Sequence, residues 1–196
     1  MTDMLFDGDD DAATPLTAEE REALIPTYIT LRRELNEAEQ IGIADADRWA
    51  FARARDVLDE PFLRALHKRM FGKVWRWAGD YRTTARNIGV DAYRIITELH
   101  QLLGDVRYWV EHQTYPADEI AVRFHHRLVF IHPFPNGNGR HARVAADLLA
   151  VRVGQPRFTW GRVNLTEPKA TRAAYVTALR AADAHDIAPL LAFARS

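Results

Sequence analysis

Cysteine is absent from the 196 residues of this chain, which excludes disulfide bonds, thiolate metal sites and a cysteine nucleophile. No apolar run approaches the ~18 residues that a membrane-spanning helix needs. The N-terminus is acidic, whereas a signal peptide is basic and then apolar. The formal net charge is only −1, so charge indicates neither nucleic acid nor a membrane surface as a partner. These absences favour a cytoplasmic protein.

Apolar residues recur at helical spacing along most of the chain, and strand-like alternation is minimal. The sequence therefore predicts an all-α fold, with a short helix that starts at a capping box over residues 17–20. Longer helices are expected over residues 27–40, 46–54, 60–71, 94–112, 117–131, 140–153 and 166–182. No internal repeat or low-complexity linker divides the chain.

One run, residues 132–143, combines several features of a binding loop between two of these helices. Pro133 and Pro135 prevent a continuous helix, while Gly137 and Gly139 permit backbone angles that other residues resist. The pattern predicts a tight loop that opens onto the N-terminus of the next helix. Such a terminus has unbonded N–H groups and a dipole that favours an anion.

The side chains of this run suit phosphate chemistry. Arg140 and Arg143 lie one helical turn apart, where guanidinium groups can hold phosphate oxygens. His132 could accept a proton from a hydroxyl group, and Asn136 offers a carbonyl oxygen as a weak ligand for Mg²⁺. Together they indicate phosphoryl or nucleotidyl transfer to a hydroxyl. A structural histidine beside an ordinary Asn-Gly turn is the alternative.

The run resembles the signature of the Fic/Doc family, which reads His, any residue, Phe, any residue, Asp or Glu, Gly-Asn-Gly-Arg, two residues, Arg. It matches at His132, Phe134, Gly137, Asn138, Gly139, Arg140 and Arg143. It departs at Asn136, where the family usually has an acid. The surrounding sequence, from about residue 25 to residue 193, resembles the branch called mobile mystery protein B.

The resemblance implies a helical Fic fold with a small β-hairpin, the flap, over the active site. It also implies transfer of a nucleoside monophosphate, most often AMP from ATP with Mg²⁺ or Mn²⁺, to a Ser, Thr or Tyr hydroxyl of a target protein. His132 would be the general base, and the backbone around Gly137, Asn138 and Gly139 would hold the phosphates. Arg140 would hold the β- and γ-phosphates, and Arg143 the γ-phosphate.

Asn136 leaves a second function open. The family acid binds the metal that bridges the phosphates, and a neutral amide loses a full charge of attraction for a hard cation. The alternative is therefore a non-catalytic or weakly active nucleotide-binding module with a regulatory role. His132 argues for catalysis, because anion binding alone does not need it.

The flap is expected over residues 83–95, with its tip at Ile88, Gly89, Val90 and Asp91. In the family, this element aligns an extended target segment by strand addition, which reads backbone rather than sequence. An ordinary surface loop is the alternative.

Glu34 is the predicted inhibitory residue. Many Fic proteins carry a helix with Ser or Thr, three residues and Glu, then Gly or Asn, whose Glu pairs with the second signature arginine. Thr30 and Glu34 fit this pattern, although Leu35 stands where Gly or Asn is expected. A surface glutamate paired with a nearby arginine is the alternative. The inhibitor could also be a separate antitoxin or regulatory partner.

These predictions divide the chain into a flexible acidic arm over 1–16, N-terminal helices with the possible inhibitory helix over 17–45, and a Fic core over 46–196. The histidines at 125, 126, 132 and 141 have no recognised ligand spacing, so the sequence does not favour a zinc site.

Overall fold

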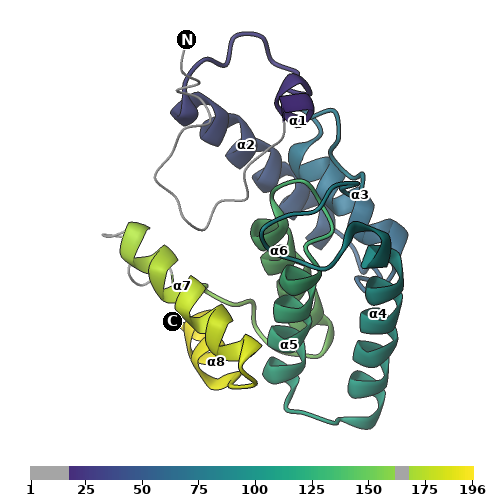
Figure 1. Ribbon diagram of the computed structural model, residues 1–196. Coiled ribbons are helices and arrows are strands. Elements are labelled where there is room, and N and C mark those ends of the chain that lie inside the picture. The colour runs from purple at the N-terminus through teal and green to yellow at the C-terminus, as the bar shows by residue number, and fades with distance from the viewer. Residues whose placement is uncertain (1–17, 162–167) are drawn as a thin grey trace.

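The computed structural model describes residues 18–161 and 168–196. Within those ranges all of the named elements are helices (Figure 1). The elements are α1 (Ala18–Glu22), α2 (Arg32–Phe51), α3 (Glu60–Phe71), the 3₁₀ turn η1 (Ala92–Arg94), α4 (Ile95–His112), α5 (Ala117–Ile131), α6 (Asn138–Arg152), α7 (Pro168–Asp183) and α8 (Ala188–Arg195). The predicted all-α fold is confirmed. The predicted arm over residues 1–16 lies outside the described residues.

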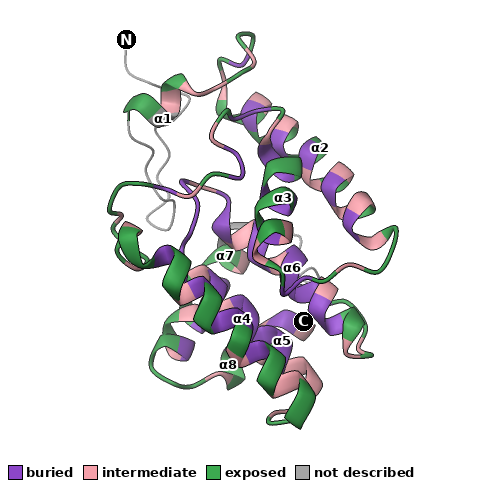
Figure 2. Cartoon of the chain, turned by 90° about the vertical axis from the view of Figure 1, so that its right-hand side faces the viewer, coloured by how far each residue is buried: buried purple, intermediate pink, exposed green. Residues whose placement is uncertain are grey.

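Helices α5 and α6 form the centre of the molecule. They pack against each other, α4 packs on α5, α2 packs on α3, and α7 packs on α8. Buried alanines cover much of α6, at positions 142, 145, 146 and 150. Small side chains let α5 approach closely, so the loop between these two helices is held by packed helices on both sides. Figure 2 shows buried stretches along both α5 and α6. None of the described helices is both long enough and apolar enough to cross a membrane.

Helix α2 corrects the prediction of separate helices over 27–40 and 46–54. It runs unbroken from Arg32 to Phe51 and contains Gly42. A Cβ atom at Gly42 would lie 2.2 Å from the carbonyl oxygen of Met70 on α3. The glycine therefore serves close helix packing here, and that contact outweighs its weak helix propensity. The proposed boundary between residues 45 and 46 falls inside this helix.

The expected β-hairpin is not formed: residues 83–91 are a chain of bends with no strand assigned. One buried side chain replaces the missing ladder of backbone hydrogen bonds. Arg82, which is 2% exposed, donates from its guanidinium to the carbonyls of Thr84 and Val90, near the two ends of the segment. We keep the name flap for residues 83–91.

The segment after α6 is held by Asp147. Its carboxylate accepts the backbone N–H of Phe158 at 3.2 Å and the indole N–H of Trp160 at 2.9 Å. Both aromatic side chains are buried, so this part of the segment packs into the core without regular secondary structure. The predicted start of the next helix at residue 166 lies outside the described residues, and the described helix begins at Pro168.

Candidate active site

The loop between α5 and α6 has left-handed backbone at both ends. His132 ends α5 with φ 54° and ψ 58°, and Gly137 precedes α6 with φ 79°. A histidine at positive φ costs of order 1–3 kcal/mol, and it persists only where the surrounding structure enforces it. The sequence places glycine at the second position, where a Cβ would also lie 2.6 Å from the Phe71 ring. The packed surroundings thus fix the loop conformation.

Phe134 anchors the loop to the core. It is 1% exposed and stacks on the His67 ring with a centroid distance of 3.7 Å. His67 in turn accepts the Gly79 N–H at Nδ1 and lies 3.0 Å from the Asn136 carbonyl oxygen at Nε2. An accepting Nδ1 and a donating Nε2 define a neutral imidazole, and burial accordingly lowers the pKa of His67 well below its usual value. These contacts give Phe134 and His67 structural roles.

Asn138 braces the loop from inside. Its side-chain oxygen accepts the Phe134 N–H at 2.9 Å, and its side-chain nitrogen donates to the Phe134 carbonyl at 2.8 Å. The side chain is therefore committed to the loop itself, and only the backbone N–H of Asn138 could face a ligand. The backbone amides at the start of α6, from Asn138 to Arg140, have no carbonyl of an earlier helical turn to bond.

Asn136 turns back on its own loop. Its side-chain oxygen lies 2.6 Å from the Gly137 N–H, which donates to it. One amide of the predicted phosphate cradle is therefore already used. Among the described residues, no group of three or more His, Cys, Asp or Glu side chains could hold a metal ion. At the loop itself, the side chain in the position of the family acid offers a neutral amide oxygen that is already engaged by the Gly137 N–H.

His132 is arranged as a neutral base. Its Nδ1 lies 3.3 Å from the Val129 carbonyl oxygen, which can only accept, so Nδ1 carries the proton and Nε2 is unprotonated. The residue is 5% exposed. Burial lowers the pKa of His132 to about 4, and the nearby charges of Arg82 and Arg86 lower it further against the opposing effect of the Val129 carbonyl. The ring is therefore uncharged at neutral pH.

The two signature arginines have different neighbours. Arg140 Nη1 lies 2.6 Å from Glu39 Oε2 on α2, and its guanidinium lies over the Phe71 ring. Arg143 packs its guanidinium over the Tyr175 ring of α7, 4.2 Å from the centroid. Both arginines project from the first turns of α6, as predicted, but they are held by separate helices.

Glu39 is the acidic residue at the signature. It is 5% exposed, and its other carboxylate oxygen accepts the indole N–H of Trp75 at 2.7 Å. The predicted pair of Glu34 and Arg143 is not found among the described contacts. Glu34 instead accepts the backbone N–H groups of Thr30 and Leu31 at 2.9 and 3.0 Å, and these bonds lower its pKa. It caps the start of α2, five residues before Glu39.

The flap covers the base. A Cβ atom at Gly89 would lie 2.6 Å from the His132 Cβ, so the flap backbone rests directly on this residue. Ile88, at 45% exposed, presents its side chain to solvent beside that contact. Val90 is half-buried and Asp91 exposed. The structure thus brings the predicted flap tip and His132 together, although without strands.

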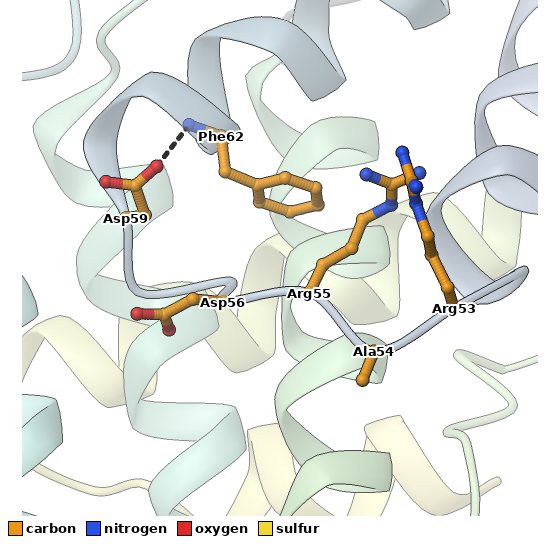
Figure 3. Close-up of a pocket in the computed structure, with 6 residues that line it drawn as sticks. All are labelled: Arg53, Ala54, Arg55, Asp56, Asp59 and Phe62. Atoms are coloured by element: carbon orange, nitrogen blue, oxygen red, sulfur yellow. Dashed lines mark hydrogen bonds between the residues drawn. The ribbon is translucent and has the colours of Figure 1, made fainter.

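A hollow of ≈ 450 Å³ at the α2–α3 connection lies apart from these residues (Figure 3). Its acidic side chains are already engaged: Asp56 is bonded by Arg107 and Arg152, and Asp59 caps α3 by accepting the Phe62 N–H at 3.2 Å. None of the predicted site residues lines it. The hollow offers no catalytic geometry.

Sequence reasoning missed Glu39 and Arg82. Each looks like an ordinary charged residue, in a helix and after a turn, and no local pattern marks either one. It also missed the pairing of the buried His125 with the hydroxyl of Tyr175, at 3.1 Å. The available signal was that His125 and Tyr175 each lie in a predicted helix, on the apolar face, where a buried polar group needs a hydrogen-bond partner.

The comparisons with known proteins now bear on this site. The model of the Fic/DOC family matches residues 57–150. Residues 57–150 of this chain belong to the Fic/Doc family. The matched range contains the whole loop, the flap and both signature arginines, whereas Glu39 lies before it and Tyr175 after it.

Curated and solved Fic proteins resemble more of the chain. Protein adenylyltransferase fic-1 of Caenorhabditis elegans is 30% identical over 169 residues, which cover 82% of this chain and 32% of that protein. A solved fragment of C. elegans Fic-1 superposes with a TM-score of 0.68 and 26% identity, covering 90% of this chain and 52% of the other. BepC of Bartonella tribocorum, solved with bound AMPPNP, gives a TM-score of 0.68 at 19% identity and covers 91% and 97% of the two chains. This chain therefore spans about a third of the length of the curated relative.

Proposed function

We propose that this chain transfers AMP from ATP to a hydroxyl group of a target protein. The observation that carries the proposal is the arrangement of the loop. A neutral histidine with its Nε2 unprotonated ends α5, and the first amides of α6, which have no intrahelical partner, begin only six residues later. The name of the fic-1 relative, a protein adenylyltransferase, supports the same chemistry.

In this proposal His132 removes the proton from the target hydroxyl. The hydroxyl oxygen then forms a bond to the α-phosphorus, the bond from that phosphorus to the oxygen leading to the β-phosphate breaks, and pyrophosphate leaves. A neutral Nε2 is the form of histidine that can accept the proton. A low pKa keeps the ring in this form at neutral pH but makes it a weak base, so orientation of the hydroxyl carries much of the rate.

The phosphates would lie at the start of α6. The amides of Asn138, Gly139 and Arg140 face an anion there with the positive end of the helix dipole behind them, and Arg140 adds a full charge. Arg143, held over Tyr175, would reach the terminal phosphate. A divalent cation bound to the nucleotide would meet the neutral side-chain oxygen of Asn136 where the family has an acid.

We further propose that Glu39, rather than Glu34, restrains the site. Its carboxylate occupies Arg140 from the side of α2, so incoming phosphates must compete with it. The indole of Trp75 holds the carboxylate in that position. An inhibitory helix acting from within the same chain leaves an antitoxin as an additional partner rather than a required one. The resemblance to the mobile mystery protein B branch stays a prediction.

The second candidate is a nucleotide-binding regulatory module without transfer. The observation that favours it is the Asn136 side chain, which replaces the family acid and uses the Gly137 amide for itself. This function requires ATP binding but not His132.

Labelled ATP separates the two candidates. Purified wild type, His132→Ala and Glu39→Gln proteins are incubated with ATP labelled at the α- or γ-phosphate, with Mg²⁺ and with Mn²⁺, in the presence of a cell extract as the source of targets. Label from the α position only, lost in His132→Ala while ATP binding persists, is the expected result. Label from the γ position only would identify phosphorylation. ATP binding without label in any variant would establish the regulatory module.

A further inference from the structure

Arg82 is a buried cation that forms no ion pair with a carboxylate of the described residues; burial lowers its pKa, and the nearby charge of Asp91 opposes that shift. Its side chain is among the most buried charged groups of the described residues, at 2% exposed. All of its hydrogen bonds go to backbone carbonyl oxygens, and no carboxylate of the described residues bonds to it. A desolvated charge normally requires an ion pair, so this arrangement needs an explanation.

The carbonyls that Arg82 binds belong to two separate segments. Nη1 donates to Thr84 at 2.9 Å and Nη2 to Val90, near the two ends of the flap. Nε donates to the His132 carbonyl at 2.6 Å, and Nη2 also lies 3.4 Å from that of Ile131. The planar guanidinium presents its N–H groups in a fixed fork, which is what lets one side chain join these segments.

The backbone of Arg82 adds to the same connection, because its N–H donates to the Pro133 carbonyl at 2.9 Å. The bonded carbonyls of residues 131, 132 and 133 are those of the left-handed turn that ends α5. This turn would otherwise be strained at His132, and it directs the imidazole. A side chain that binds these carbonyls therefore determines both where the flap lies and how the base is held.

We propose that Arg82 is a positioning residue that fixes the flap across His132, so that the segment expected to receive the target and the base that acts on it move as one unit. This role deepens the proposed function and rests on it in one respect, the assignment of residues 83–91 as the segment that receives the target. It separates two tasks: Arg82 governs the target side of the site, whereas Arg140 and the α6 amides govern the nucleotide side.

Native-state trypsin cleavage tests the connection directly, without any transfer assay. Arg86 lies in the flap, so cleavage of the Arg86–Asn87 bond, followed by mass spectrometry, reports opening of residues 83–91. Arg82→Lys keeps the charge but loses the fork, and we expect its cleavage rate at this bond to rise by about tenfold or more. Cleavage at Arg53–Ala54, outside the flap, serves as the internal reference.

Arg64→Lys is the matched control. Arg64 also donates to a backbone carbonyl, that of Gly79 at 2.9 Å, but it contacts neither the flap nor the loop. Its substitution should leave flap cleavage unchanged. Gly89→Ala disturbs the contact between the flap and His132 from the flap, because the new Cβ would clash with His132 and Arg82. It should open the flap with Arg82 intact, and it tests the proposal even if Arg82 variants fold poorly.

Two further measurements distinguish positioning from general stability. ATP affinity should remain that of the wild type in Arg82→Lys and Gly89→Ala. In NMR titrations, the pKa of His132 should rise in Arg82→Gln, which removes a neighbouring positive charge, and stay near the wild-type value in Arg82→Lys, which keeps it. Arg86 stays charged in both variants and provides a constant background.

Unchanged flap cleavage in both Arg82→Lys and Gly89→Ala would overturn the proposal. So would cleavage that rises equally at the flap and at Arg53–Ala54 together with lost ATP binding, which is the result expected of a merely structural arginine. If wild type fails to transfer label while the flap opens as described, the proposed transferase function falls and the connection made by Arg82 stands.

Discussion

Replacing Glu39 by glutamine should release Arg140 and raise the affinity of the chain for ATP. The carboxylate lies 2.6 Å from Arg140 Nη1 and is only 7% exposed, while the Arg140 side chain is 33% exposed. Glutamine keeps an oxygen for the Trp75 indole N–H and removes only the charge. The substitution therefore tests the ion pair with little disturbance of packing.

The size of the effect follows from the strength of that bond. A hydrogen bond between charged groups contributes about 1.5–3 kcal/mol, and solvent around Arg140 reduces this to roughly 1–2 kcal/mol. Because each 1.4 kcal/mol is a factor of ten, ATP should bind about 5–30 times more tightly to Glu39→Gln than to wild type. Transfer of label from the α position should rise with it at subsaturating ATP.

Isothermal titration with ATP and label transfer, measured on the same preparations, provide the assay. Glu34→Gln is the control, since Glu34 lies on the same helix but its described hydrogen bonds come from the backbone N–H groups of Thr30 and Leu31 and from the Thr30 hydroxyl, at the start of that helix. It should lower thermal stability without changing ATP affinity. Equal ATP affinity and transfer in wild type and Glu39→Gln would refute the restraint. A gain in Glu34→Gln instead would return the inhibitory role to Glu34.

Three further outcomes can be checked. Burial lowers the pKa of His141 to about 4, below its unfolded value of about 6.5. The neutral ring therefore contributes fully to the unfolding free energy above pH 6.5, and this contribution is lost as the pH falls toward 4. His141→Gln should reduce the acid-induced loss of unfolding free energy by about 3 kcal/mol, and an unaltered pH dependence would contradict this. Gly137→Ala, with φ 79° and a Cβ 2.6 Å from Phe71, should cost at least ~1–3 kcal/mol in denaturant unfolding and abolish transfer, whereas Gly104→Ala, with open space around it in α4, should stabilise by ~1 kcal/mol. Asn136→Asp should lower the Mg²⁺ concentration needed for half-maximal transfer, and no change in metal dependence would argue against a role for this position.

Much of the fold could be predicted because its causes are local. The bounds of α3, Glu60–Phe71, and of α5, Ala117–Ile131, agree with the prediction, since helical periodicity, the Asp59 cap and the prolines define them within a few residues. Predictions failed where a distant contact decided the outcome. Separate helices over 27–40 and 46–54 were predicted, but α2 runs through the gap between them, and packing against Met70 makes glycine the residue that fits at position 42. The flap suggested strands, but the Arg82 side chain took the carbonyls that a ladder would have used.

The sequence by itself determined most of the helices, the loop of residues 132–137 and the side chains that the loop contains. Spacing along one helix and the limits on proline and glycine are properties of neighbouring residues, and they can be read without the fold. Only the tertiary structure decided that Glu39 meets Arg140, 101 positions away, and that Arg82 meets His132, 50 positions away. Which face of α2 is turned toward α6 depends on how whole helices pack, and that is a property of the entire core rather than of any segment.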